Sequence, residues 1–151
     1  MFFRERICAI IYTSLKDKRY TQIIMENKKR IRVVLVEDDE ILSAMYDEAL
    51  SLMGFSVGVA KSGQEGLRLI EENEPDIVIL DIVMPDGDGF FVLRKIRENQ
   101  KIKNVPVIMH TNLYNESDKA EALKLGAKEY VIKAQITPKQ LVQIVKKYMK
   151  A

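Results

Sequence analysis

The sequence has very few of the residues that build disulfides and zinc sites. Its 151 residues include one cysteine, Cys8, one histidine, His110, and no tryptophan. A lone cysteine excludes an internal disulfide and favours a reducing compartment, so we expect a cytoplasmic protein. With a single histidine beside it, a zinc site made of cysteine and histidine ligands is also excluded.

Long hydrophobic runs are absent too. Hydrophobic residues make up 47% and charged residues 30% of the chain, which is ordinary for a globular protein. The uncharged run at residues 7–15 is too short to cross a membrane and lacks a convincing cleavage site. The length suits one domain, and a second would be cramped.

The basic residues concentrate at the start of the chain. Residues 1–30 contain eight basic and three acidic residues, a net of +5, which leaves −3 for residues 31–151 of the +2 total. We predict an N-terminal extension outside the fold at 1–30 and a folded domain at 31–151. An upstream start codon would explain such a tail, because Met25 also begins a plausible domain start. A basic amphipathic helix that contacts a membrane or partner, and a signal peptide, are the less favoured alternatives.

Five short apolar runs alternate with five amphipathic patterns. The runs predict strands at residues 31–36, 55–59, 77–80, 105–109 and 129–132. The patterns predict helices, and for four of them the residues that face inward. In the first helix these are Ile41, Met45 and Ala49, together with Leu42 and Leu52. In the second they are Leu67 and Ile70, in the third Phe90, Leu93 and Ile96, and in the last Leu141, Ile144, Val145 and Tyr148. The fourth helix covers about residues 116–125.

Glycines and capping residues punctuate these helices. Gly54 and Gly126 follow the first and fourth helices, as helix C-terminal glycines do. Ser62 with Glu65, and Thr137 with Gln140, have the spacing of capping boxes. The alternation of elements predicts an α/β fold, a doubly wound parallel sheet sandwiched between helix layers. In the flavodoxin-like strand order 2-1-3-4-5, strands one and three flank the point where ligands bind.

Polar residues cluster where the predicted strands end. Glu37, Asp38 and Asp39 follow the first strand, Asp81 the third, Thr111 the fourth and Lys133 the fifth. Carboxylates gathered in one pocket repel each other and need a cation, and ligands of oxygen alone favour Mg²⁺. Metal and Lys133 would together attract a phosphoryl group, with Asp81 as the nucleophile. Each residue alone has a simpler explanation, such as a helix cap, so the set carries the prediction.

Four motifs resemble those of the receiver domain of two-component response regulators, over residues 31–148. They are VLVEDD at 34–39, IVILDIVMPDGDG at 77–89, PVIMHT at 106–111 and GAKEYVIK at 126–133. The resemblance implies a phosphoacceptor rather than an enzyme, in which Asp81 receives phosphate from a histidine kinase or a histidine phosphotransfer protein. It implies a Mg²⁺ site made of Glu37, Asp38, Asp81 and the backbone carbonyl of Val83, with Asp39 outside the pair. Thr111 and Tyr130 match the switch residues, and Lys133 matches the phosphate-binding lysine.

Two positions depart from the family pattern. Ala134 stands where proline usually follows the lysine, so the loop there should have a different shape. Asn112 stands where a small residue usually follows the switch threonine, and it should narrow access to the site or add a hydrogen-bond partner. We also hypothesise that Val83 and Leu113 present apolar side chains to the attacking water and slow loss of the phosphate.

The resemblance implies an output through the fourth helix, fifth strand and fifth helix of the domain to a downstream protein. Three residues follow Tyr148, so we expect no DNA-binding helix-turn-helix and no direct contact with nucleic acid or membrane. We expect a monomer or a phosphorylation-dependent dimer. Three other functions are the alternatives. A flavodoxin-like nucleotide binder is disfavoured by the three carboxylates after the first strand. An aspartyl phosphatase would need a second acid two residues after Asp81, where this chain has Val83. The third alternative is a receiver-like module that signals without phosphate.

Overall fold

The computed structural model describes residues 30–149 and contains a single five-stranded sheet within them. Its strands are β1 (Arg32–Val36), β2 (Ser56–Ala60), β3 (Ile77–Leu80), β4 (Val107–Thr111) and β5 (Glu129–Ile132). They are joined by helices α3 (Glu40–Leu52), α4 (Gly63–Asn73), α5 (Gly89–Glu98), α6 (Glu116–Lys124), a 3₁₀ turn η1 (Lys133–Gln135) and α7 (Pro138–Tyr148). All pairs are parallel and the order is β2-β1-β3-β4-β5, which confirms the predicted topology.

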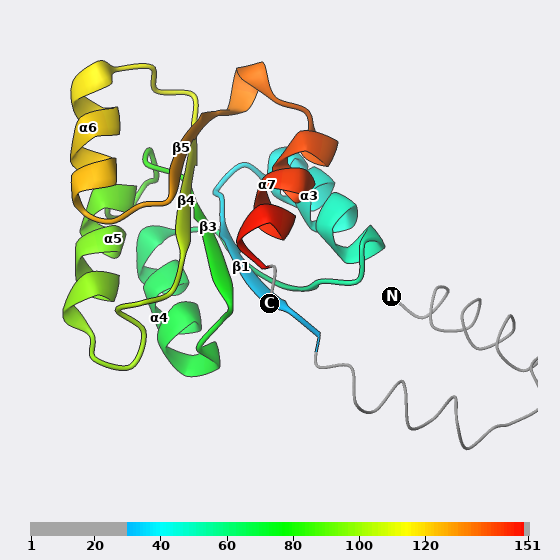
Figure 1. Cartoon of the computed structure of the whole chain (residues 1–151), viewed down its shortest axis with the longest axis horizontal. Helices are drawn as coiled ribbons and strands as arrows, with labels where there is room; N and C mark the ends of the chain where they lie inside the picture. Colours follow the sequence, from blue (N-terminus) through cyan, green and yellow to red (C-terminus); the bar gives the residue numbers. More distant parts are fainter. Residues whose placement is uncertain (1–29, 150–151) are drawn as a thin grey trace, which may run out of the picture. The chain divides into compact units, whose positions relative to one another are not determined.

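Helices cover both faces of this sheet. In Figure 1, α3 and α7 lie on one face and α4, α5 and α6 on the other. Strand β3 shows why both layers are needed, because all four of its residues are buried. Ile77 and Ile79 pack into the core beneath α3 and α7, while Val78 and Leu80 pack into the core beneath α4, α5 and α6. A parallel strand buried on both faces is apolar at every position, as this one is.

The helix ends largely follow the sequence signals. Thr137 Oγ1 accepts from the N–H of Gln140, and Gln140 Oε1 accepts from the N–H of Thr137, which confirms the capping box of α7. Ser62 likewise accepts from the N–H of Glu65, but the Glu65 carboxylate reaches the N–H of Lys61 instead of that of Ser62. The second predicted box is therefore only half formed.

Helix α3 corrects the prediction of its inward face. Ile41 is 81% exposed and Met45 38% exposed, whereas Ser43, Tyr46 and Leu50 are buried. Only Leu42 and Ala49 of the predicted set pack partly against the core, and Leu52 is also exposed. The apolar residues of this helix form two overlapping stripes, and the stripe that contains Tyr46 and Leu50 faces the sheet.

Strand β4 also differs from its prediction. It begins and ends two residues later than the predicted 105–109, so Thr111 is the last residue of the strand instead of lying beyond it. Thr111 is paired with Ile132 of β5, and this register fixes where the Thr111 side chain lies.

His110 of β4 is a packed core residue. It is 1% exposed, and its ring meets the edge of Tyr46 with centroids 4.8 Å apart. Within residues 30–149 neither ring nitrogen has a hydrogen-bond partner. Burial, helped by the positive charge of Lys133, lowers the pKa of His110 to about 3. The imidazole is therefore neutral at physiological pH.

The predictions for residues 1–29 lie outside the described residues, and the boundary between extension and domain stays a prediction. Within residues 30–149, each helix is too short or too polar to span a bilayer.

Acid should destabilise the native protein through His110. Its pKa is about 3 in the fold against an ordinary 6.5, so the unfolded chain binds a proton that the folded chain rejects, and stability is lost as pH falls from about 6.5 toward 3. At pH 5 this effect amounts to about 2 kcal/mol, and at pH 7.5 to about zero. Urea unfolding of wild type and His110→Leu across this range tests it. The gap between the two proteins should change by that amount on acidification, and a constant gap would contradict the assignment.

Candidate functional site

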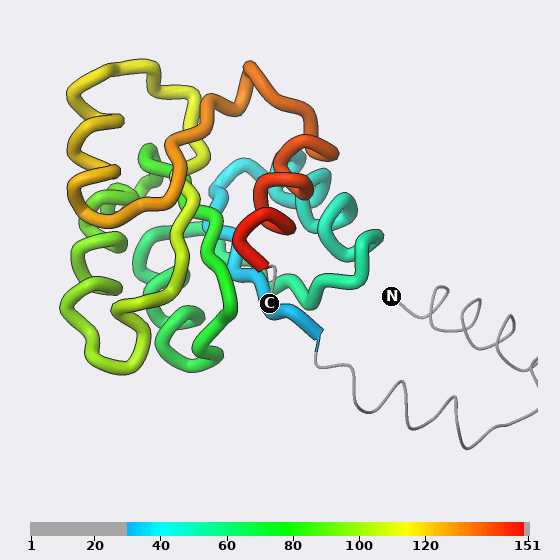
Figure 2. The backbone as a smooth tube through the Cα atoms, in the orientation of Figure 1, coloured from blue at the N-terminus to red at the C-terminus, as the bar shows by residue number. Residues whose placement is uncertain are grey.

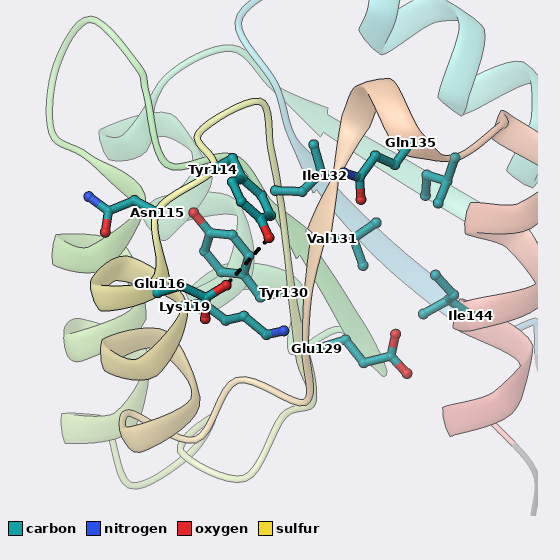
Figure 3. A pocket seen from close by; sticks show the side chains of 11 residues that line it. Tyr114, Asn115, Glu116, Lys119, Glu129, Tyr130, Val131, Ile132, Gln135 and Ile144 are labelled. Atoms are coloured by element: carbon teal, nitrogen blue, oxygen red, sulfur yellow. Dashed lines mark hydrogen bonds between the residues drawn. The ribbon is translucent and has the colours of Figure 1, made fainter.

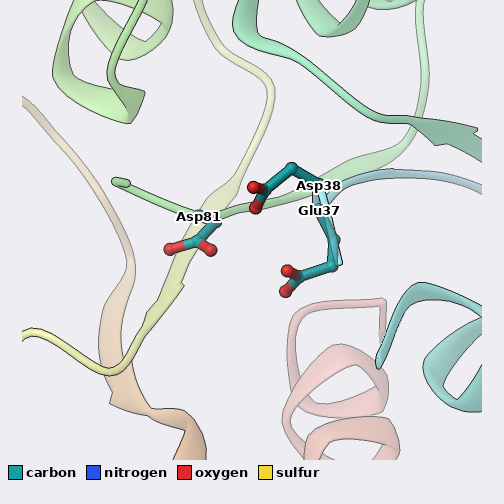
Figure 4. Close-up of side chains that lie close together, drawn as sticks. All are labelled: Glu37, Asp38 and Asp81. Atoms are coloured by element: carbon teal, nitrogen blue, oxygen red, sulfur yellow. The ribbon is translucent and has the colours of Figure 1, made fainter. Parts of the chain in front are cut away.

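Three carboxylates meet at the carboxyl edge of the sheet. Glu37 and Asp38 follow β1 and Asp81 follows β3, and these strands are neighbours, with Val36 paired to Leu80. Figure 4 shows the three carboxylate groups turned toward one another. One oxygen from each lies within 4.8 Å of the other two. The predicted acidic cluster is therefore brought together by adjacent parallel strands, and its oxygen donors suit a hard divalent cation.

Asp39, the next residue in the chain, caps a helix instead of joining the cluster. Its Oδ1 accepts from the N–H groups of Ile41 and Leu42, both at 2.9 Å, which makes it the N-cap of α3. A capping carboxylate satisfies the free amides of the first turn. The acidic run thus divides into a pair for the cluster and a cap for the helix.

A buried ammonium faces these carboxylates. Lys133, the first residue after β5, forms ion pairs with Glu37 and with Asp81, the latter at 2.6 Å from Nζ to Oδ2. Its side chain is 8% exposed. Burial alone would lower the pKa of Lys133, but the two carboxylates outweigh burial and raise it, so the lysine stays protonated. Burial also raises the pKa of Glu37, and the ammonium offsets only part of that rise.

Backbone groups hold the other oxygen of Asp81. Oδ1 accepts from the N–H of Ile82 at 2.7 Å and from that of Val83 at 3.4 Å. Asp81 is only 6% exposed, so both of its carboxylate oxygens are surrounded by protein groups. Gly89, the first residue of α5, makes this close packing possible, because a Cβ there would lie 2.2 Å from the carbonyl oxygen of Asp81. Sequence reasoning gave Gly89 no role beyond the turn.

The two predicted switch residues contact one loop, the segment after β4. Thr111 is fully buried, and its Oγ1 accepts from the N–H of Leu113 at 3.2 Å. The Tyr130 hydroxyl donates to the carbonyl of Leu113 at 2.8 Å. Burial, with the negative charges of Asp118 and Asp81, raises the pKa of Tyr130, which keeps the phenol protonated and able to donate.

Tyr130 also lines a cavity of about 380 Å³ between α6, β5 and α7. Tyr114 and Glu116 line the same cavity and are joined by a hydrogen bond, seen as a dashed line in Figure 3. Apolar side chains from β5 and α7, including Val131 and Ile144, form its other wall. Tyr130 therefore links the loop after β4 to this cavity.

The two departures from the family pattern contact each other. Asn112 Oδ1 accepts from the backbone N–H of Ala134 at 3.1 Å. The expectation that Asn112 adds a hydrogen-bond partner is confirmed. That its partner would be the second unusual residue was not foreseen, because the two lie 22 positions apart and only the pairing of β4 with β5 brings them together.

Comparison with known proteins agrees with this geometry. Residues 33–146 match the model of the response regulator receiver domain. The chain belongs to this family. It is 38% identical over 123 residues to the "Probable transcriptional regulator ycf27" of Guillardia theta, covering 82% of this chain and 46% of that protein. It is 36% identical over 101 residues to the "Transcriptional regulatory protein AfsQ1" of Streptomyces coelicolor, covering 67% of this chain and 44% of that one. The receiver chain thus spans less than half the length of these relatives.

Solved receiver structures superpose well on this domain. The chemotaxis protein CheY4 of Vibrio cholerae matches with a TM-score of 0.75 and 25% identity, over 80% of this chain and all of that one. The receiver domain of the Francisella response regulator 1452 matches with a TM-score of 0.72 and 28% identity, over 79% and 96% of the two chains. The fold and family membership of this receiver domain therefore rest on sequence and structure together.

Removing the ammonium should leave the buried carboxylates uncompensated. We expect Lys133→Met to lower the free energy of unfolding by about 3 kcal/mol at neutral pH in the presence of a chelator. Added Mg²⁺ should restore part of the loss, because a cation that binds only the folded protein stabilises it. The measurement is urea unfolding with EDTA and with Mg²⁺.

Lys147→Met is the matched control for that measurement. Lys147 also pairs with a glutamate, Glu129, but its side chain is 64% exposed. Exposed pairs contribute little, so this variant should unfold like the wild type with EDTA and gain the same stability from Mg²⁺ as the wild type does. Equal losses in the two lysine variants would contradict the assigned charge balance.

Proposed function

We propose that this receiver domain accepts a phosphoryl group on Asp81 and signals through a change of its α6–β5–α7 surface. The observation that carries the proposal is the convergence of Glu37, Asp38, Asp81 and Lys133 at one edge of the sheet. Three acids and one fixed ammonium form a pocket that attracts a divalent cation and then a phosphoryl group.

Mg²⁺ fits the donor set, with Glu37, Asp38, Asp81 and the backbone carbonyl of Val83 as the proposed ligands. When bound, Mg²⁺ would supply positive charge that offsets the charge on the phosphoryl oxygens. Carboxylates and a carbonyl are the hard oxygen ligands that this ion takes, together with water.

The donor would be a phosphohistidine on a histidine kinase or a histidine phosphotransfer protein. A carboxylate oxygen of Asp81 forms a bond to phosphorus while the P–N bond to the imidazole breaks, and the released imidazole takes a proton from solvent. Lys133, already held beside Asp81, would neutralise one phosphoryl oxygen. The buried Thr111 hydroxyl would donate a hydrogen bond to another.

The signal would then follow from where Thr111 and Tyr130 are held. If Thr111 turns toward the phosphoryl group, the loop at Leu113 shifts and its hydrogen bonds to Thr111 and Tyr130 are exchanged. Tyr130 lines the cavity between α6, β5 and α7, so its reorientation changes the surface offered to a downstream protein. Such a change is a shift between two populations driven by a local charge. We propose that the protein acts in the cytoplasm. It would meet its protein partners as a monomer or as a phosphorylation-dependent dimer.

The test of the proposal is phosphorylation by a small donor. Incubation with Mg²⁺ and acetyl phosphate should add one PO₃ group to the intact mass, with acetate as the leaving group. Asp81→Asn should remain unmodified, whereas Asp86→Asn, which alters an exposed aspartate of the same loop, should be modified like the wild type. An unmodified wild-type protein would favour the alternative, a receiver-like module that binds its partner without phosphate.

A second expectation concerns the lifetime of the aspartyl phosphate. Val83 is 58% exposed and Leu113 38% exposed, two residues after Asp81 and Thr111 respectively, so both place apolar surface beside the site. Apolar groups cannot orient an attacking water, and we expect the phosphate to survive for minutes. Val83→Asn should shorten that lifetime, measured as the decay of the phosphorylated mass after removal of the donor. A wild-type half-life of seconds would contradict the hypothesis.

A further inference from the structure

The loops that carry the two proposed phosphate-binding residues leave the sheet side by side. Thr111 ends β4 and is followed by Asn112, and Lys133 follows β5 and precedes Ala134. Thr111 is paired with Ile132 in the parallel register, so the residues beyond them continue as neighbours. In Figure 2 the yellow loop after β4 and the orange loop after β5 leave the same end of the sheet.

One hydrogen bond joins these loops beyond the last paired residues. Asn112 Oδ1 accepts from the N–H of Ala134 at 3.1 Å. The bond needs a side-chain acceptor at 112 and a backbone donor at 134. Alanine at 112 would supply no acceptor, and proline at 134 would supply no N–H. The two unusual residues therefore depend on each other. With a small residue at 112 or proline at 134, as in the family pattern, the hydrogen bond could not form.

The donor of this bond, Ala134, follows Lys133, whose side chain is held in place. The acceptor, Asn112, follows Thr111 and belongs to the loop that the proposed function requires to move. Lys133 is fixed by its ion pairs with Glu37 and Asp81. On the other loop, Thr111 accepts from Leu113 and Tyr130 donates to Leu113. The Asn112–Ala134 bond thus joins the loop after β4 to the loop after β5. It does so in the arrangement in which Thr111 is bonded within its own loop.

We propose that Asn112 is a positioning residue, whose bond to Ala134 acts as a latch that holds the Thr111 loop away from a phosphoryl group on Asp81. The proposal rests on the phosphoacceptor function above and adds a regulatory element to it. A latch that exists in one of two arrangements shifts the population toward that arrangement and weakens any ligand that needs the other.

The expected size follows from the chemistry of the bond. A neutral hydrogen bond between exposed groups changes an equilibrium by about three- to tenfold. Breaking the latch should therefore tighten the binding of a phosphoryl mimic by about three- to tenfold. The pocket itself, made of Glu37, Asp38, Asp81 and Lys133, would be unchanged.

The experiment measures the apparent affinity of the full chain for beryllium trifluoride in the presence of Mg²⁺, followed by amide NMR. The variants are Asn112→Ala, Ala134→Pro and the double substitution. Asn112→Ala also removes bulk near the site. Ala134→Pro keeps the Asn112 side chain and removes the donor, and it also restricts the backbone of Lys133. Asn99→Ala is the matched control, because Asn99 Oδ1 accepts from the N–H of Lys101 at 3.0 Å in the α5–β4 loop, at the other end of the strands.

Both single variants should bind beryllium trifluoride about three- to tenfold more tightly, and the double variant no more tightly than either, because all three lose the same bond. Asn99→Ala should bind like the wild type, even if it loses similar stability in urea. If Ala134→Pro fails to fold, Asn112→Ala alone decides the direction. Unchanged or weaker binding by Asn112→Ala, with Asp81 still phosphorylated by acetyl phosphate, would overturn the latch alone. Failure of the wild type to take up either phosphoryl compound would overturn the proposed function and the latch with it.

Discussion

The receiver domain depends on the buried ammonium of Lys133 between Glu37 and Asp81. Burial by itself would lower the pKa of the lysine, yet that pKa is raised because two carboxylates face it. The same ammonium limits the cost of gathering carboxylates at one edge of the sheet, although Glu37 still has a raised pKa because it is buried. The residues that compensate one another here come from the ends of β1, β3 and β5, so the charge balance holds only in the folded protein.

The opposite edge of the domain is tied by a different kind of contact. Arg97 of α5 is partly buried, which lowers its pKa, and it donates to backbone carbonyls rather than to an acid in the contacts described. Its four acceptors are the carbonyl oxygens of Leu125, Lys103, Val105 and Gly126. One guanidinium thereby fastens the end of α6 and the segment before β4 to α5. The guanidinium is a rigid fork of donors, so one side chain can hold several carbonyls at once.

The loop after β4, at the edge that carries the acidic cluster, is held by single, separable contacts. Leu113 is bonded once through its N–H and once through its carbonyl, and Asn112 is bonded once to Ala134. Each of these bonds contributes modestly and can be exchanged for another. A loop held lightly beside the acidic cluster suits the proposed function, in which a change of charge at Asp81 would alter the α6–β5–α7 surface.

Much of this molecule was predictable from its sequence, since local patterns report local physics. Strands buried on both faces are apolar throughout, which located β3 to the residue, and the box at Thr137 and Gln140 marked the start of α7. The strand-end acids and Lys133 followed from the rule that parallel strands present their carboxyl ends at one edge. Tertiary structure decided what depends on the rotation of elements and on distant pairing. It buried Tyr46 instead of Ile41 in α3, and it joined Asn112 to Ala134. A helix with two apolar stripes does not encode which one faces the sheet, and residues 22 positions apart become neighbours only when two strands pair.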